Sequence, residues 1–477
     1  MHREVSPALA AYGPGLAYSR LLRLRSGPDV QPPSLEVECD LCLSWEQTSS
    51  TVYLFTLRSG VKWHNIPPVN GRELTAQDVA ASFERMLTPG LATAKLLQNL
   101  ASVTVVDTYT LKVEARKADA DFLLTLADGH AKVLPQELLR DPAGLQNGPV
   151  IGTGPWIWVD DSKVDGTVLR SNSAYFEPGV PRLEEVRFQF IPDEATAYAA
   201  FSSRLLDLHQ VLPKDWQGLL SRHPSLETLR YPLVATGLEL ALKTTSAPFD
   251  DLRARKSLLL SLDPWSLNAS VWQDMAYVSV GMPVVRADWL LGEAELRSYL
   301  ASPSEARALL SYFSPSSLSF VLTVADLGPE YLTYARGLVD QMRSVGFRPE
   351  LKTVNPLVYG ANVWQGGEYV AYLGPIAPML TPNDYLLGVA HGGGRWNTHG
   401  LKEPSLDRLI EAQAVETDPQ RRKELVLELQ REFLDKAVRF LPTTRKVPWA
   451  WWPHVKGFYP NLAAFESFFW ARIYIEK

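Results

Sequence analysis

The residues best suited to chemistry are Cys39 and Cys42, the only two cysteines of the chain, in the stretch "ECDLCLSW". A Cys-x-x-Cys pair can be a redox dithiol, half of a zinc site or a short-loop disulfide. A zinc site needs two further ligands at compatible spacing, and a thioredoxin-type dithiol belongs at a helix N-terminus that follows a strand. The sequence has neither context, so we expect a structural or incidental pair, with its redox state left open.

Histidines and carboxylates are the next candidates. Among eight histidines, only His391 and His399 lie close together, on either side of "GGGRWNT". Imidazole binds first-row metals, but a third and a fourth ligand are missing nearby, so we predict no metal site and ordinary polar residues instead. Adjacent acids such as Glu184 and Glu185 point to opposite faces of a strand, which favours solvated turns and helix caps over catalytic pairs.

Motifs of known enzymes are absent from the sequence. It contains no HExxH, no GxSxG, no Walker loop and no GxGxxG. The Gly-rich stretches "GTGPW" and "HGGGRW" do not lead from a strand into a helix N-terminus, so phosphate binding is disfavoured. We therefore predict a protein that is not an enzyme and uses no cofactor; a hydrolase acting on peptides or glycans through a carboxylate pair is the alternative from another class.

Composition places the chain among ordinary globular proteins. It has 477 residues, 46% of them hydrophobic and 21% charged, and a formal net charge of -6. The length suggests two or three compact units, and the negative charge argues against a nucleic-acid surface. Aromatic residues are numerous, with 14 Trp, 18 Tyr and 17 Phe. They suit a cleft for a mixed polar and apolar ligand, although any single Trp is more readily explained by core packing.

The elements that must position any site alternate between strands and helices. Residues 53–57 alternate apolar and polar side chains, which predicts a strand. A helix should begin after Thr75, whose hydroxyl and the Asp78 carboxylate form a capping box, and should bury residues 79, 83, 86 and 87. The stretches "IGTGPWIWVD" and "GTVLRSN" predict the two strands of a hairpin, joined by a polar turn at residues 160–166. A strand around 186–190 then leads to a helix that uses Phe201 and Leu205. Near the end of the sequence, "SLDRLIEAQAVETDPQRRKELVLELQREFLDKA" predicts two helices that are split at Thr417-Asp418-Pro419, with Asp418 as the cap of the second helix. Strands and helices thus alternate along the chain, so the fold class is α/β with mixed sheets.

Five segments together resemble one family. "YLFTLRSGVKWH…LTAQDVAASFERM" is similar to the signature of the family 5 extracellular solute-binding proteins, the peptide- and nickel-binding receptors of ABC importers. Four more segments match in the same order: "LAYSRLLRL…ECDLCLSWE", "GTGPWIWVDDSKVDGTVLRSN…FQFIPDEATAYAAFSSRLLDL", "APFDDLRARKSLLLSLD" and "SLDRLIEAQAVETDPQRRKELVLELQREFLDKAVRFLP". The resemblance covers almost the whole chain.

The resemblance implies a two-lobed periplasmic-binding-protein-like fold, type II, of the large three-subdomain variety. Lobe I would comprise residues 1–243 and 447–477, with an inserted subdomain at roughly 40–150, and lobe II residues 244–446. Two crossing segments, near 240–247 and 443–449, would form the hinge. Family members carry a first strand and an export or lipoprotein signal ahead of "SPALAAYGPGLAYSRLL", and we expect both to lie outside this sequence.

The function that the resemblance implies is capture of a small solute, an oligopeptide or dipeptide, between two lobes and delivery to a membrane permease. Its partners would be that ligand and the permease and ATPase subunits of an ABC importer, with no nucleic acid, and the protein would be an extracytoplasmic monomer. Receptors of the same fold for nickel, sugar or opine ligands are alternatives, as is a receptor that senses its ligand without transport. The sequence does not identify the ligand.

Candidate ligand contacts come from the same resemblance. Peptide-binding members hold the ligand's α-amine with an aspartate, and the matching position here is Pro378, with Asp384 displaced beyond Pro382 as a possible substitute. The predicted ligand-binding residues are Asp384, Tyr385, Arg395, Trp396 and Asn397. Arg395 is suited to bind a carboxylate through two hydrogen bonds, and Trp396 to form the wall of a side-chain pocket.

Overall fold

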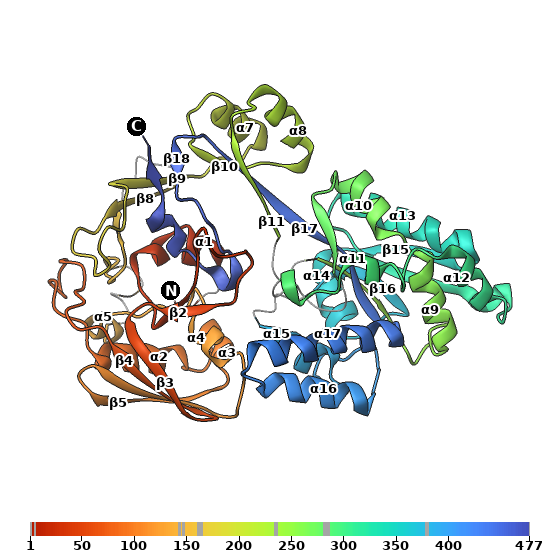
Figure 1. Cartoon of the computed structure of the whole chain (residues 1–477), viewed down its shortest axis with the longest axis horizontal. Helices are drawn as coiled ribbons and strands as arrows, with labels where there is room; N and C mark the ends of the chain where they lie inside the picture. Colours follow the sequence, from red (N-terminus) through yellow and green to blue (C-terminus); the bar gives the residue numbers. More distant parts are fainter. Residues whose placement is uncertain are drawn as a thin grey trace. The chain divides into compact units, whose positions relative to one another are not determined.

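The chain forms two compact units in the computed structural model (Figure 1). Unit 1 comprises residues 1–209, 223–227 and 450–477, and unit 2 comprises residues 210–222 and 228–449. The structure describes residues 2–3, 6–141, 145, 148–159, 166–232, 237–279, 287–376 and 381–476. The lobe boundaries and hinge segments given above stay predictions.

A four-stranded antiparallel sheet forms one part of unit 1, in the order β3 (Cys42–Ser49), β4 (Val52–Leu57), β6 (Thr110–Ala115) and β5 (Leu100–Asp107). The predicted strand is confirmed as β4. Its residues Tyr53, Phe55 and Leu57 are buried, as the alternation requires. Helix α2 (Ala76–Met86) packs against β5 and β6.

The start of α2 follows the predicted capping box. The backbone N–H of Thr75 donates to the Asp78 carboxylate at 3.1 Å, and the Arg72 guanidinium donates two hydrogen bonds to the same carboxylate at 2.7 and 2.8 Å. A negative charge in the first helical turn is stabilised by the helix dipole. The helix then buries Val79, Phe83 and Met86, as its spacing predicts, whereas Leu87, also predicted to be buried, is the C-cap residue and is only half-buried.

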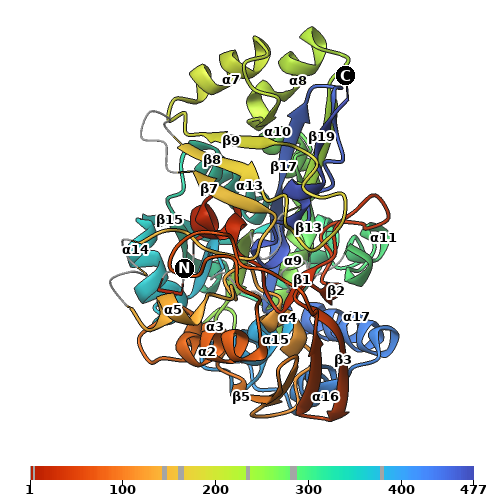
Figure 2. The ribbon, with the colours of Figure 1, turned by 90° about the vertical axis from the view of Figure 1, so that its left-hand side faces the viewer.

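A second, three-stranded sheet of unit 1 contains the predicted hairpin, β7 (Trp156–Val159) and β8 (Gly166–Ser171), with β9 (Glu185–Gln189) at its edge (Figure 2). The predicted helix is α7 (Glu194–Ser202), and it buries Phe201. Leu205 was predicted on its buried face, which is wrong, because α7 ends at Ser202 and Leu205 is 74% exposed. Arg204 adopts a left-handed conformation (φ 62°) and turns the chain away.

The "GTGP" loop before β7 packs directly on the N-terminal segment of unit 1. Gly154 donates its N–H to the carbonyl of Ala17 at 2.9 Å. His64 holds the other side of the loop, because its backbone N–H donates to Gly152 O at 2.8 Å and its Nδ1 accepts the Gly152 N–H at 3.3 Å. Burial lowers the pKa of His64 to about 4, so its ring stays neutral and Nδ1 remains an acceptor.

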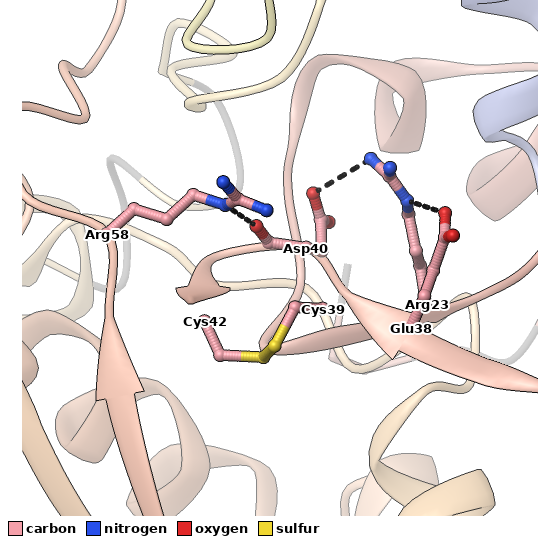
Figure 3. Close-up of a disulfide and its surroundings, with 6 residues drawn as sticks. All are labelled: Arg23, Glu38, Cys39, Asp40, Cys42 and Arg58. Carbon is pink, nitrogen blue, oxygen red and sulfur yellow. Dashed lines mark hydrogen bonds and ion pairs between the residues drawn. A yellow bond between two sulfur atoms is a disulfide. The ribbon is translucent and has the colours of Figure 1, made fainter. Parts of the chain in front are cut away.

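The two cysteines form a disulfide (Figure 3). Cys39 ends strand β2 (Val37–Cys39) and Cys42 begins β3, so the bond closes a loop that contains Asp40. The Asp40 carboxylate accepts the backbone N–H of Arg20 at 2.7 Å, and its carbonyl accepts Nε of Arg58 at 2.9 Å. Of the alternatives for this pair, the structure therefore shows the short-loop disulfide.

The remaining helices and strands of unit 1 are short. They are α1 (Pro7–Ala11), η1 (Pro14–Ala17), β1 (Leu22–Leu24), α3 (Ala92–Leu96), α4 (Phe122–Leu126), α5 (Gln136–Leu139), β18 (Val455–Lys456), η6 (Ala463–Phe465), η7 (Phe468–Arg472) and β19 (Tyr474–Ile475). Strand β10 (Leu208–Gln210) contains a point at which the chain passes from one unit to the other.

The centre of unit 2 is a mixed sheet. Strand β14 (Ser319–Ala325) pairs in parallel with β15 (Arg348–Val354) and with β16 (Ala371–Pro375). Strand β12 (Leu238–Leu242) pairs antiparallel with β16 and with β17 (Arg439–Trp451). Strands β11 (Glu227–Pro232) and β13 (Ala276–Ser279) also pair with β17.

One face of this sheet contributes to the main core of unit 2. Leu238, Leu240 and Leu242 of β12 belong to a buried cluster with residues of α9 (Leu252–Ser261) and α13 (Pro329–Val345). Because side chains alternate along a strand, Glu239 points to the opposite face. That face is the one on which the polar groups described below meet.

The other elements of unit 2 include the two predicted closing helices, α16 (Pro404–Val415) and α17 (Pro419–Lys436), which lie side by side (Figure 1). Asp418 caps α17 by accepting the N–H of Arg421 at 2.7 Å, as its position before Pro419 predicts. The rest are α8 (Pro213–Arg222), α10 (Pro264–Trp272), η2 (Ala287–Trp289), α11 (Glu293–Leu296), α12 (Pro303–Leu310), η3 (Pro315–Leu318), α14 (Pro356–Val358), η4 (Tyr359–Gln365), α15 (Pro382–Tyr385) and η5 (Leu386–Ala390).

Within the described ranges, none of the helices has the length and apolar character needed to cross a membrane.

Candidate functional site

The predicted ligand-binding residues all fall in unit 2, on α15 and on the loop between η5 and α16. Helix α15 begins after Thr381, whose hydroxyl accepts the N–H of Asp384 at 3.2 Å, and Pro382 occupies its first turn. Both features fix the start of a helix. Pro378, the position matched to the α-amine aspartate, lies outside the described residues.

Tyr385 is held inside unit 2. Its side chain has no exposed surface, and its hydroxyl donates to the Glu239 carboxylate at 2.6 Å. Burial raises the pKa of Tyr385 well above its ordinary value, so the hydroxyl keeps its proton and acts as a donor. In this conformation Tyr385 anchors α15 to strand β12.

Glu239 is the centre of a buried polar network. Arg439 on the neighbouring strand β17 donates to the Glu239 carboxylate at 2.7 Å, and both side chains have no exposed surface. The Tyr372 hydroxyl on β16 contacts both Glu239 and Arg439. A buried carboxylate is stable only when it is paired and fully hydrogen-bonded, and this network supplies a cation and two hydroxyl donors.

The network retains unused polar atoms. Among the described residues, Nε and Nη1 of Arg439 and the hydroxyl of Tyr359 have no hydrogen-bond partner. The Tyr359 ring packs so closely on β16 that a Cβ at Gly374 would lie 2.3 Å from it. The Tyr359 ring therefore fills the space over Gly374 on β16, the strand that also carries Tyr372 of the network.

Arg395 and Trp396 form a stacked pair in the loop. The Arg395 guanidinium lies 4.2 Å from the centre of the Trp396 ring, and the Trp396 ring lies 5.4 Å from that of Trp364. A cation over an aromatic face is attracted by the ring quadrupole. Arg395 is exposed, so its N–H groups can meet an anion from solution while the stacking limits their motion.

Asn397 shapes this loop. Its Nδ2 donates to the carbonyls of His391 and Leu401 at 2.9 and 2.8 Å, and its Oδ1 accepts the Gly400 N–H at 3.1 Å. The amide thus binds three backbone groups of its own loop. Asn397 holds the loop that presents Arg395.

The two neighbouring histidines do not converge on one point. His391 pairs with Glu411 at 3.1 Å, whereas His399 is buried and accepts the N–H of Leu401 at 3.0 Å. In the part of the chain that the structure describes, no group of three or more His, Cys, Asp or Glu residues is arranged to hold a metal ion.

Sequence reasoning did not find Glu239, Arg439 or Tyr372. A signal was present for the first, because Glu239 interrupts the apolar run "LELAL" of a strand, and a charge at such a position requires a partner. No pattern in one sequence indicates that the partner lies 200 residues away, at Arg439.

Comparison with known proteins identifies the class. The model of the bacterial extracellular solute-binding proteins, family 5 (middle region), matches residues 36–398, which is most of the chain. The chain belongs to this family.

Two relatives of this chain are named for different ligands. Heme-binding protein A of Haemophilus influenzae is 27% identical over 333 residues, which are 64% of this chain and 59% of that protein. The probable D,D-dipeptide-binding periplasmic protein DdpA of Escherichia coli is 23% identical over 456 residues, 93% of this chain and 86% of that protein. The chain thus matches less than two thirds of the first relative's length.

Solved structures share the fold. HbpA2 from Haemophilus parasuis superposes with a TM-score of 0.83 at 20% identity, covering 99% of this chain and 95% of that one. A peptide-binding protein AppA from Clostridium difficile, described as putative, gives a TM-score of 0.81 at 17% identity, with 99% and 98% coverage. The predicted two-lobed α/β binding-protein fold is confirmed.

Proposed function

We propose that this chain is the substrate-binding protein of an ABC importer and that it delivers an oligopeptide or dipeptide to a membrane permease. The observation that carries the proposal is the family match over residues 36–398. Names of relatives that include dipeptide-binding and di/tripeptide-binding proteins support a peptide. The ABC permease and ATPase subunits, a location outside the cytoplasm and a monomeric state belong to the same proposal.

Binding without chemistry is part of this proposal. The relatives of this chain are named as binding proteins. The stacked Arg395 suits recognition of a carboxylate, and Asp384 suits recognition of an amine, so together they match the two ends of a peptide. Both assignments are proposals.

Calorimetry with a ligand panel tests the ligand class. The panel contains di- and tripeptides, glutathione, haem, Ni²⁺, sugars and opines, and native mass spectrometry of the protein purified from its host identifies any retained ligand. We expect micromolar or tighter binding of at least one peptide. Binding of sugars alone would refute the peptide assignment and leave the binding-protein role standing.

Substitutions test the two residues. Arg395→Gln and Asp384→Asn are each expected to weaken binding of the identified peptide at least tenfold, because charge-assisted hydrogen bonds contribute about 1.5–3 kcal/mol. The matched controls are Arg408→Gln and Asp340→Asn, which alter exposed residues of unit 2. Unchanged affinity in Arg395→Gln or in Asp384→Asn would remove that residue from the site.

A further inference from the structure

Unit 2 contains a groove between α12, η3 and the end of α13. Its lining residues, within 307–318 and 343–348, are different from the predicted ligand-binding residues. Its volume is about 590 Å³, within the range of about 300–1,000 Å³ in which small-molecule sites fall. Its floor is formed by Leu310 and Leu318, which are buried in the unit 2 core, and its apolar surface comes from Phe313 and Pro315, which are partly or fully exposed.

Three arginines surround this apolar surface: Arg307, Arg343 and Arg348. No Asp or Glu is among the described residues that line the groove. The chain as a whole carries a net charge of -6, so the charge of these three cations is opposite in sign to the net charge of the chain. The groove therefore has a local charge of the opposite sign to the rest of the molecule.

The arginines are only partly compensated by their surroundings. Arg343 donates to the carbonyl of Pro349 at 3.1 Å and lies 3.8 Å from Asp340, a side chain that is 76% exposed. Arg307 and Arg348 form no ion pair with any residue that the structure describes. Arg307 and Arg343 lie in the last turns of α12 and α13, where the negative end of the helix dipole favours a cation. The dipole end carries only about half an elementary charge, so it does not neutralise an arginine. Arg348 lies on β15 and has no such helix end.

The backbone keeps the groove open. Helix α13 ends at Gly346, which adopts φ 123° and lines the groove without a side chain. The N–H groups of Gly346 and Phe347 close the helix by donating to Arg343 O and Met342 O, at 3.1 and 3.2 Å. A residue with a Cβ would be strained at this φ, so the opening at Gly346 is a fixed feature.

We propose that this groove is a second ligand site, which binds a soluble amphiphilic anion: a phosphate or carboxylate group attached to an apolar body. The anion would be held by the three arginines, which offer planar N–H donors, and the apolar body would lie against Phe313 and Pro315, the apolar lining residues that keep exposed surface. An anion without an apolar body leaves this surface in water, and a neutral amphiphile leaves the cations without a partner. The site is separate from the solute site of the proposed function.

Calorimetry with octyl phosphate tests the chemistry. We expect one octyl phosphate per chain, bound at least tenfold more tightly than either inorganic phosphate or octyl glucoside. Equal affinity for octyl phosphate and octyl glucoside would overturn the role of the arginines. Binding to phosphatidylglycerol vesicles without any binding of octyl phosphate would overturn the proposal of a soluble ligand.

Substitutions locate the site. The double variant Arg307→Gln/Arg348→Gln and the single variant Ser311→Asp, which adds a negative charge to the exposed lining, are each expected to weaken octyl phosphate binding at least tenfold. Arg336→Gln, an exposed arginine of α13 outside the groove, is the matched control and should bind as the unaltered protein does. Retained affinity in both groove variants would refute the assignment. Since all of the substituted side chains are exposed, the variants are expected to fold.

Discussion

Replacing Gly152 with alanine tests the packing of the "GTGP" loop, one of the motifs that carry the family resemblance. A Cβ at this position would lie 1.8 Å from the carbonyl oxygen of Ala17 and 2.6 Å from its carbonyl carbon. Both atoms belong to the backbone, so no side-chain rotation relieves the clash. The loop must move away from the N-terminal segment.

The cost follows from the contacts that this movement breaks. Three of the loop's hydrogen bonds involve Ala17 or Gly152: Gly154 N–H to Ala17 O, His64 N–H to Gly152 O, and Gly152 N–H to His64 Nδ1. Each contributes about 0.5–1.5 kcal/mol, and overpacking adds about 1–3 kcal/mol. We therefore expect Gly152→Ala to lower the free energy of unfolding of unit 1 by about 4 kcal/mol. For a unit of this size the melting temperature should fall by about 8–16 °C.

Differential scanning calorimetry is the suitable assay, because two units can unfold in separate transitions. Gly218→Ala provides the control: Gly218 is an exposed residue of α8, and a Cβ there meets no atom within 4 Å. Alanine is the better helix former, so the control should stabilise its helix by about 0.5–1 kcal/mol. A loss below about 1 kcal/mol in Gly152→Ala would refute the view that the loop is fixed against Ala17.

Three further predictions concern the buried polar groups. The folded state holds the pKa of His64 near 4, whereas the unfolded value is 6.5. The free energy of unfolding should therefore fall by roughly 3 kcal/mol as the pH drops from about 6.5 to about 4. In urea unfolding across this range, the free energy of unfolding of His64→Gln should depend less on pH. Glu239→Leu should cost about 3–5 kcal/mol in urea unfolding because it leaves Arg439 buried without its carboxylate, and adding Arg439→Met should recover most of the loss. Cys39→Ser/Cys42→Ser should destabilise unit 1 by about 2 kcal/mol in calorimetry, as expected for a loop with a sequence separation of 3, and should abolish any effect of dithiothreitol.

Local sequence signals were sufficient for much of the fold. The alternation of β4, the capping box at α2 and the Asp418 cap of α17 depend on residues within a few positions of one another, and the structure has each of them. The end of α7 was missed because such helix ends usually carry Gly or Asn in the left-handed position, and here that residue is Arg204.

The candidate site was only partly accessible to sequence reasoning. The Glu239–Arg439 pair depends on β12 and β17 becoming neighbours, which is decided by the packing of the whole unit. The structure brings Tyr385 to this pair and places Arg395 over Trp396, and neither arrangement follows from spacing along the chain. The roles of these residues in ligand binding stay predictions.

The central claim is that this protein binds a small solute and releases it unaltered. The most direct test combines calorimetry with mass spectrometry of the ligand recovered after prolonged incubation with a stoichiometric amount of protein. We predict one bound ligand per chain and full recovery of the intact molecule. Conversion of the ligand into a product would contradict the account.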